Sequence, residues 1–243
     1  MAFFYSPNVV TDGLVFAVDA ANKKSYPGSG TTWTDLAGSN NGTLTNGPTF
    51  DSGNGGSIVF DNTDDIILCG SSNNVTGDNL QTCTLAAWFK TTTTGRGYIA
   101  SIKRQSTPST LITISVNTTG NGQETNGVAG LMTRDYANTN HVSITTNNNG
   151  NGWNDGQWHY LVGTVNSSTR IMYIDGVQQG TDTNGMQEVT GNTADFTIGG
   201  FATSGFSNQF YEGNIANVSF YTRALSSTEI TQNYNALKSR FGL

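Results

Sequence analysis

The stretch GQWHYLVGTVNSSTRIMYIDGVQQG, Gly156–Gly180, is the most informative about the fold, because successive side chains along it alternate with a period of two residues. Residues 158–165 form one alternating run, and residues 171–175 form a second run after the turn Asn166–Ser168. A period of two residues is typical of a β-strand. Asp175-Gly176, between apolar residues, is a strong signal for a hairpin turn. The stretch therefore predicts consecutive antiparallel strands joined by tight turns.

Further short apolar runs lie on both sides of this stretch. CTLAAWFKTT (83–92) is the strongest of them, and both of its faces are expected to be at least partly buried. Turn signals recur about every 8–12 residues, as in a sandwich or barrel. Thirty glycines and only four prolines suit many tight turns. The pattern predicts one all-β domain, residues 13–243, after an N-terminal arm of residues 1–12. The other expected strands are 13–21, 57–60, 66–69, 96–104, 110–117, 128–134, 141–147, 196–201 and 213–221.

The C-terminal end of the chain changes to a helical pattern. After the strand-like run 213–221, the segment LSSTEI fits a helix start. Ser226 is placed as the N-cap, Glu229 completes a capping box, and Leu225 forms a hydrophobic staple with Ile230. A short amphipathic helix is therefore expected to pack on the sandwich. Apolar residues repeat at helical spacing along it, at Ile230, Tyr234, Leu237 and Phe241.

Charge and composition exclude several classes of protein. The net charge is −6 and the densest basic cluster is Lys23-Lys24, so we expect no nucleic-acid groove. No apolar run approaches the roughly 20 residues of a membrane span. The start, MAFFYSPNVV, lacks the basic and long apolar regions of a secretion signal, so synthesis in a cytoplasm is expected. Cys69 and Cys83 flank a polar loop, and two free thiols are favoured over a disulfide.

These pieces, taken in order, resemble the laminin-G-like, concanavalin A-like jelly rolls. The resemblance covers most of residues 13–242 and implies two antiparallel sheets, one of them concave, with the chain ends near each other. The opening segment, residues 13–50, is also similar to segments common in virion proteins of tailed bacteriophages, where such domains occur in head decorations, fibres and adhesins. The matching pieces are SIVFDNTDDIIL (57–68), CTLAAWFKT (83–91), the stretch 156–180, FTIGGF (196–201) and FYEGNIANVSFYTRALSSTEI (210–230).

Some relatives with this fold are glycoside hydrolases, which place two carboxylates about 5–5.5 Å apart when they retain stereochemistry. The related glucanases carry them as Glu-x-Asp-x-Glu along one strand. No such spacing occurs here, and the adjacent Asp64 and Asp65 would point to opposite faces of a strand. No Gly-x-Ser-x-Gly elbow occurs either. We therefore expect no catalytic residues and no enzymatic activity. The four glutamates are Glu124, Glu188, Glu212 and Glu229.

Many relatives bind Ca²⁺ through carboxylates and carbonyls. Their last strand often reads Gly-x-Ile-Asp-Glu-Val, whereas Gly213–Val218 reads Gly-Asn-Ile-Ala-Asn-Val and lacks both acids. Asn217 offers an amide oxygen, and Asp19 in the first strand joins it as a weak candidate metal pair. The oxygen-rich loop DNTDD (61–65) is more typical of a turn. We expect no cofactor, or at most one weakly held structural Ca²⁺.

Glycan binding requires exposed aromatic rings beside amides and carboxylates. Trp153, inside NNNGNGWNDGQ, is the best candidate for an exposed ring, whereas Trp88, Trp158 and Tyr211 are expected in the core. An exposed phenylalanine equally suits an anchor on a neighbouring capsid or fibre subunit. The candidate face for a glycan or a partner comprises Tyr136, Trp153, Asn154, Asp155, Phe201 and Phe206.

The sequence thus predicts a non-enzymatic structural protein of a phage particle, displayed as a head decoration and oligomeric in the assembled particle. Its expected partners are capsid or fibre subunits, together with cell-surface glycans. Two alternatives stay open: a free carbohydrate-binding lectin, with or without Ca²⁺, and a tail-fibre adhesin.

Overall fold

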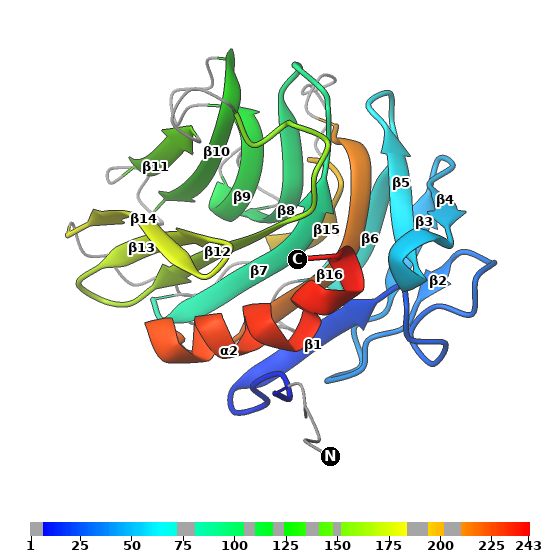
Figure 1. Ribbon diagram of the computed structural model, residues 1–243, viewed down its shortest axis with the longest axis horizontal. Helices are drawn as coiled ribbons and strands as arrows, with labels where there is room; N and C mark the ends of the chain where they lie inside the picture. Colours follow the sequence, from blue (N-terminus) through cyan, green and yellow to red (C-terminus); the bar gives the residue numbers. More distant parts are fainter. Residues whose placement is uncertain are drawn as a thin grey trace.

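The computed structural model of the chain describes residues 7–71, 81–104, 110–118, 124–134, 141–147, 152–183, 194–201 and 210–243. Two antiparallel β-sheets face each other in a sandwich, and one short α-helix follows at the C-terminal end (Figure 1). The predicted all-β, jelly-roll-type sandwich with a C-terminal helix is therefore confirmed.

The first sheet, called sheet A, contains eight strands in the order β14-β13-β12-β7-β16-β5-β4, with β1 also paired to β16. The long strand β16 pairs through its first half with β5 and through its second half with β1, and β7 runs along its other side. The strands are β1 (Leu14–Asp19), β4 (Thr49–Asp51), β5 (Ser57–Asp61), β7 (Cys83–Lys90), β12 (His159–Val165), β13 (Arg170–Ile174), β14 (Val177–Asp182) and β16 (Glu212–Tyr221).

The second sheet, called sheet B, contains eight strands in the order β11-β10-β9-β8-β15-β6-β3-β2. The chain crosses from one sheet to the other at several points, for example between β5 and β6 and between β7 and β8, and the core forms between the two sheets. The strands are β2 (Thr32–Trp33), β3 (Gly42–Thr45), β6 (Ile66–Ser71), β8 (Gly97–Arg104), β9 (Thr110–Thr118), β10 (Glu124–Arg134), β11 (His141–Asn147) and β15 (Ala194–Ile198). The described residues also include the 3₁₀ turns η1 (Gly53–Gly55) and η2 (Lys238–Phe241) and helix α2 (Ser227–Leu237).

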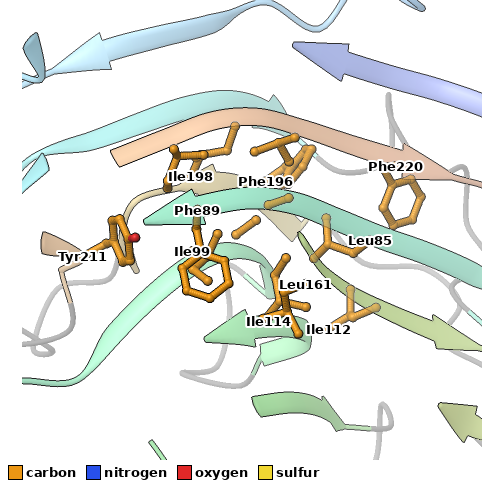
Figure 2. Close-up of a cluster of buried hydrophobic side chains, with 14 of the residues drawn as sticks. Leu85, Phe89, Ile99, Ile112, Ile114, Leu161, Phe196, Ile198, Tyr211 and Phe220 are labelled. Carbon is orange, nitrogen blue, oxygen red and sulfur yellow. The ribbon is translucent and has the colours of Figure 1, made fainter. Parts of the chain in front are cut away.

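The main core consists of the inward-facing side chains of both sheets. Figure 2 shows residues of β7, β12 and β16, among them Leu85 and Phe89, pointing toward residues of β8, β9 and β15, such as Ile99 and Phe196. Period-two alternation explains this arrangement, because every second residue of a strand points to the same face. Tyr211, predicted in the core, is fully buried there.

The two cysteines face this core from opposite sheets, Cys69 from β6 and Cys83 from β7. Both are buried thiols that are not joined in a disulfide, as predicted. Burial raises the pKa of the Cys83 thiol to about 12, and it also raises the pKa of Cys69, which lies near the negative charge of Asp35. Neither thiol is therefore ionised near neutral pH.

Helix α2 lies across the outer face of sheet A (Figure 1). The predicted capping box is present: Glu229 N–H donates to the Ser226 hydroxyl at 3.3 Å, and Ser226 N–H donates to the Glu229 carboxylate at 2.9 Å. Trp88, which points outward from β7, stacks on Phe241 with ring centroids 4.3 Å apart. Both faces of β7 are consequently buried, one in the main core and the other beneath the C-terminal segment.

The described part of the predicted N-terminal arm is docked against α2. Val10 N–H donates to Oδ1 of Asn233 at 2.7 Å, and the Tyr221 hydroxyl donates to the Val10 carbonyl at 3.0 Å. Gln232 donates to the Asn8 carbonyl at 2.8 Å. Residues 1–6 lie outside the described residues. Over the part of the chain that the structure describes, no helix has the length and apolarity needed to cross a membrane.

Candidate functional site

A hollow of about 560 Å³ opens on sheet A where strands β5 and β7 end and β16 begins. Helix α2 and η2 pack over Trp88, Tyr160 and Ala216, and the hollow lies beyond the part of the sheet that they cover. The polar side chains in its wall are Asp61, Lys90, Thr91, Thr92, Glu212 and Asn214.

Strand register places these side chains on one face of the sheet. Glu212 lies opposite Asp61, and Asn214 lies opposite Lys90 on one side and Val59 on the other. Their chain neighbours Phe60, Phe89 and Ile215 point into the main core. Alternation therefore turns the polar set outward, toward the hollow.

The charged groups of the hollow do not neutralise one another. Asp61 and Glu212 are exposed and stand directly opposite, a placement in which like charges destabilise a sheet. The Lys90 ammonium lies 5.3 Å from the centroid of the Trp158 ring, a cation–π contact. None of these three side chains takes part in the ion pairs among the described residues.

Hydrogen bonds to the backbone hold the wall in place. The Thr91 hydroxyl donates to the Glu212 carbonyl at 2.6 Å, and the buried Tyr211 hydroxyl donates to the Lys90 carbonyl at 2.9 Å. Asn214 donates through Nδ2 to the Ser57 hydroxyl at 3.0 Å. The hollow is thus a preformed site in which carboxylates accept hydrogen bonds and an ammonium donates them.

The predicted residues Asn154 and Asp155 lie beside this hollow, because the next residue, Gly156, belongs to its wall. Asn154 donates through Nδ2 to the Thr93 carbonyl at 2.7 Å and to Oδ1 of Asn126 at 2.8 Å. Its amide therefore fastens the loop rather than standing free for a ligand.

Trp153 is 7% exposed, so the prediction of an exposed stacking ring is wrong. Its ring meets that of His159 edge-on, with centroids 5.0 Å apart. Gly127 in β10 and Gly152 in the segment before β12, both at positive φ, allow these two stretches of backbone to approach closely, because a Cβ on Gly127 would lie only 2.8 Å from the Gly152 Cα. This approach turns the indole inward.

His159 joins the same loop to the β13–β14 hairpin. Its Nδ1 lies 2.8 Å from an Asp175 oxygen, and its Nε2 lies 3.1 Å from an Asp155 oxygen. Burial alone would lower the pKa of His159, but the hydrogen bonds and charges of Asp175 and Asp155 outweigh it and raise the pKa. Only the doubly protonated imidazolium can donate to both carboxylates, which makes this group a charged clamp.

The two described aromatic residues of the predicted face, Trp153 and Phe201, do not lie together. Phe201 is 5% exposed and packs on Tyr98, with ring centroids 5.4 Å apart, in a small cluster separate from the one that holds Trp153. The prediction of an exposed Phe201 is therefore wrong, because its side chain packs against Tyr98 and Met132. Tyr136 and Phe206 lie outside the described residues.

The candidate metal pair is brought together but does not fit a metal. Asp19 and Asn217 stand opposite each other in the β1–β16 pairing. However, Arg240 donates to Oδ1 of Asp19 at 2.7 Å, to the Asn54 carbonyl at 2.5 Å, and also to the Gly56 carbonyl. The guanidinium thus takes up the oxygen ligands that Ca²⁺ would use, and its charge would repel the ion.

Asp64 and Asp65 lie in the turn between β5 and β6, so the expectation that they point to opposite faces of a strand does not apply to them. Carboxylate oxygens of Asp61, Asp64 and Asp65 all lie within 4.8 Å of one another. Burial, followed by the charge of Asp61, raises the pKa of Asp65 to about 6. Asp61, which lines the hollow, therefore has two further carboxylates close to its own.

Lys90 and Asn214 were not singled out from the sequence, Asp61 was considered only within the turn-like loop 61–65, and Glu212 only as an isolated glutamate. The one available signal was Lys90, a charged residue at the end of an apolar strand. The pairing of β5, β7 and β16, which gathers these residues, depends on segments far apart in the chain.

A comparison with protein families matches residues 60–231 to the model described as the concanavalin A-like lectin/glucanases superfamily. No match is found among curated proteins.

Solved structures with similar folds include a Trypanosoma rangeli sialidase, at 16% identity and a TM-score of 0.67 over 94% of this chain. The botulinum neurotoxin serotype D binding domain matches at 15% identity and a TM-score of 0.65 over 93% of this chain. The chain spans 33% of the sialidase and 52% of the toxin structure. Likeness at this identity establishes the fold alone.

Proposed function

Because the chain belongs to the concanavalin A-like lectin/glucanase superfamily, we propose that it is a non-enzymatic glycan-binding protein displayed on the particle of a tailed bacteriophage. The observation that carries the binding role is the hollow on sheet A. Its volume of about 560 Å³ falls within the range of about 300–1,000 Å³ that small-molecule sites occupy.

The chemistry of the wall suits sugar hydroxyls, which both donate and accept hydrogen bonds. Asp61 and Glu212 supply acceptors, and Lys90 supplies a donor. Phe60 is the aromatic residue among those that line the hollow, but it is only 2% exposed and packs in the main core, and the Trp158 ring is already in contact with Phe241. Recognition is therefore polar rather than based on ring stacking.

Display on the virion is supported by the resemblance of the opening segment to phage virion proteins. In this role the chain is a head decoration that attaches to capsid subunits and meets cell-surface glycans. A tail-fibre adhesin and a free lectin are the alternatives. Mass spectrometry and electron microscopy of purified particles test the placement on the virion. If the particles lack the chain, the head-decoration role falls and the free-lectin alternative is favoured.

The absence of catalysis rests on the roles of the carboxylates. Glu229 is committed to the helix cap and to Arg223, whose hydrogen bond is the main reason that the pKa of Glu229 is lowered to about 2. Glu188 lies outside the described residues. Asp61 and Glu212 are the described pair that shares a cavity, so hydrolysis assays should use the variants Asp61→Asn and Glu212→Gln. Release of sugar by the wild type that both variants abolish would overturn the non-enzymatic assignment.

A glycan array tests the binding role directly. The wild type is expected to bind a subset of glycans, and Lys90→Met and Glu212→Gln are expected to weaken that binding. Asp12→Asn serves as the control, because Asp12 is an exposed residue paired with Arg223, outside the hollow. A blank array would refute the proposal, as would binding that neither hollow variant changes.

A further inference from the structure

The charges in the hollow indicate which class of glycan it takes. Two carboxylates, Asp61 and Glu212, face each other across neighbouring strands, whereas one ammonium, that of Lys90, lies in the same wall. The described cavity therefore carries an excess of negative charge. On the basis of the proposed function, we infer that its ligand is a cationic glycan, namely an amino sugar whose amine is free and protonated.

Neither carboxylate has a cationic partner in the ion pairs among the described residues, although Oδ1 of Asp61 accepts a hydrogen bond from the Thr63 N–H at 2.8 Å. Side chains directly opposite in an antiparallel pair have Cβ atoms about 4.5–5.5 Å apart, close enough for like charges to repel. No ion pair among the described residues relieves this repulsion. A ligand ammonium between Asp61 and Glu212 removes the repulsion and gains attraction to both groups.

Lys90 is not such a partner, since its ammonium lies over the Trp158 ring. The turn after β5 adds to the negative charge, because carboxylate oxygens of Asp64 and Asp65 lie within 4.8 Å of those of Asp61. Lys90 and Asn214 remain as neighbours for the ring hydroxyls of the same sugar.

A free amine fits better than an N-acetyl group for two reasons. A protonated amine carries the missing charge and has three N–H donors, and hydrogen bonds between charged partners are roughly twice as strong as neutral ones. Acetylation removes the charge and leaves one N–H donor, so the two carboxylates would keep their repulsion.

The test compares oligomers of β-1,4-linked glucosamine with the N-acetylated oligomers of the same length, titrated calorimetrically into the full chain. The free-amine form is expected to bind at least about tenfold more tightly, since a charged hydrogen bond is worth enough to change affinity by that factor. Glu212→Gln and Asp61→Asn are each expected to reduce this preference to near unity. Asp12→Asn is the matched control, because it makes the same carboxylate-to-amide change outside the hollow and is expected to leave the preference unchanged.

Folding does not confound the comparison, because Asp61 and Glu212 are exposed and circular dichroism checks each variant. Equal affinity for the two oligomers overturns the inference, and so does a preference that survives in both hollow variants. If the array shows bound glycans and all of them lack a free amine, the inference falls while the proposed function stands. If no glycan of any kind binds, the proposed function falls and the inference falls with it. Titrations repeated with EDTA should be unchanged, and loss of binding would assign the carboxylates to a metal ion instead.

Discussion

Replacing Arg240 by methionine should destabilise the fold without touching the hollow. Arg240 joins the C-terminal 3₁₀ turn to β1 and to the turn before β5, through Asp19 and two backbone carbonyls. Methionine keeps most of the apolar stem but lacks the guanidinium carbon, which lies 5.0 Å from the Phe241 ring centroid. The substitution therefore removes the charge and the donors while largely preserving the packing.

The expected loss follows from burial. Breaking a buried ion pair costs about 3–5 kcal/mol because the remaining charge is left unpaired. The Arg240 and Asp19 side chains are 14% and 19% exposed, so water offsets part of this cost. We expect a loss of about 2–3 kcal/mol in the free energy of unfolding. For a chain of 243 residues this corresponds to a fall of about 4–6 °C in Tm.

Thermal unfolding followed by circular dichroism measures this change. Arg240→Lys should fall between the wild type and Arg240→Met, because one ammonium cannot reach all three acceptors of the planar guanidinium. The wild-type Tm should be the same with EDTA and with added calcium, since the guanidinium holds the cation position. Stability of Arg240→Met within about 0.5 kcal/mol of the wild type would refute the argument. A rise in the wild-type Tm with calcium that disappears in Asp19→Asn would refute it as well.

Three further changes test the clamp, the helix cap and the core. Because the pKa of His159 is raised in the folded chain, the stabilisation by its charge is complete below the unfolded-state pKa of 6.5 and is lost as the pH rises through the folded-state pKa. The Tm difference between the wild type and His159→Gln should therefore be larger at about pH 6 than at about pH 9. Equal Tm differences at the two pH values would contradict the charged clamp. Ser226→Ala removes the hydroxyl that accepts from Glu229 and should cost about 1 kcal/mol in denaturant unfolding, with Ser226→Asp as a control that keeps the cap. Gly163→Ala drives a methyl group into Leu131 and should cost about 1–3 kcal/mol by the same measurement, and an unchanged midpoint would show that the core can yield there.

Local patterns predicted the elements of this fold well. The Asp175-Gly176 turn has φ values of 52° and 80°, the left-handed conformation that an Asp-Gly pair adopts readily. The capping box at Ser226 formed as expected, because all of its partners lie within four residues. These features depend on neighbours in the chain, so the sequence contains the information that specifies them.

The candidate site was predicted less well, because exposure depends on distant segments. The setting of Trp153, rich in glycine and asparagine, suggested an exposed loop, yet Gly127 from another strand allows it to pack inward. Asp19 and Asn217 do lie opposite each other in the sheet. However, Arg240, which lies near the C-terminal end of the chain, donates a hydrogen bond to Asp19 and so occupies the carboxylate that a metal ion would need.

Local sequence patterns specify the strands, the tight turns, the capped helix and the membership of a β-sandwich family, since alternation, turn residues and caps act over a few residues. The position of the proposed ligand site, in contrast, depends on the tertiary structure. The hollow exists because β16 pairs with β5 and β7, which places Asp61, Lys90 and Glu212 on one face beside the helix. Strand register between segments far apart in the chain is set by the packing of the whole core, and no short stretch of sequence specifies it.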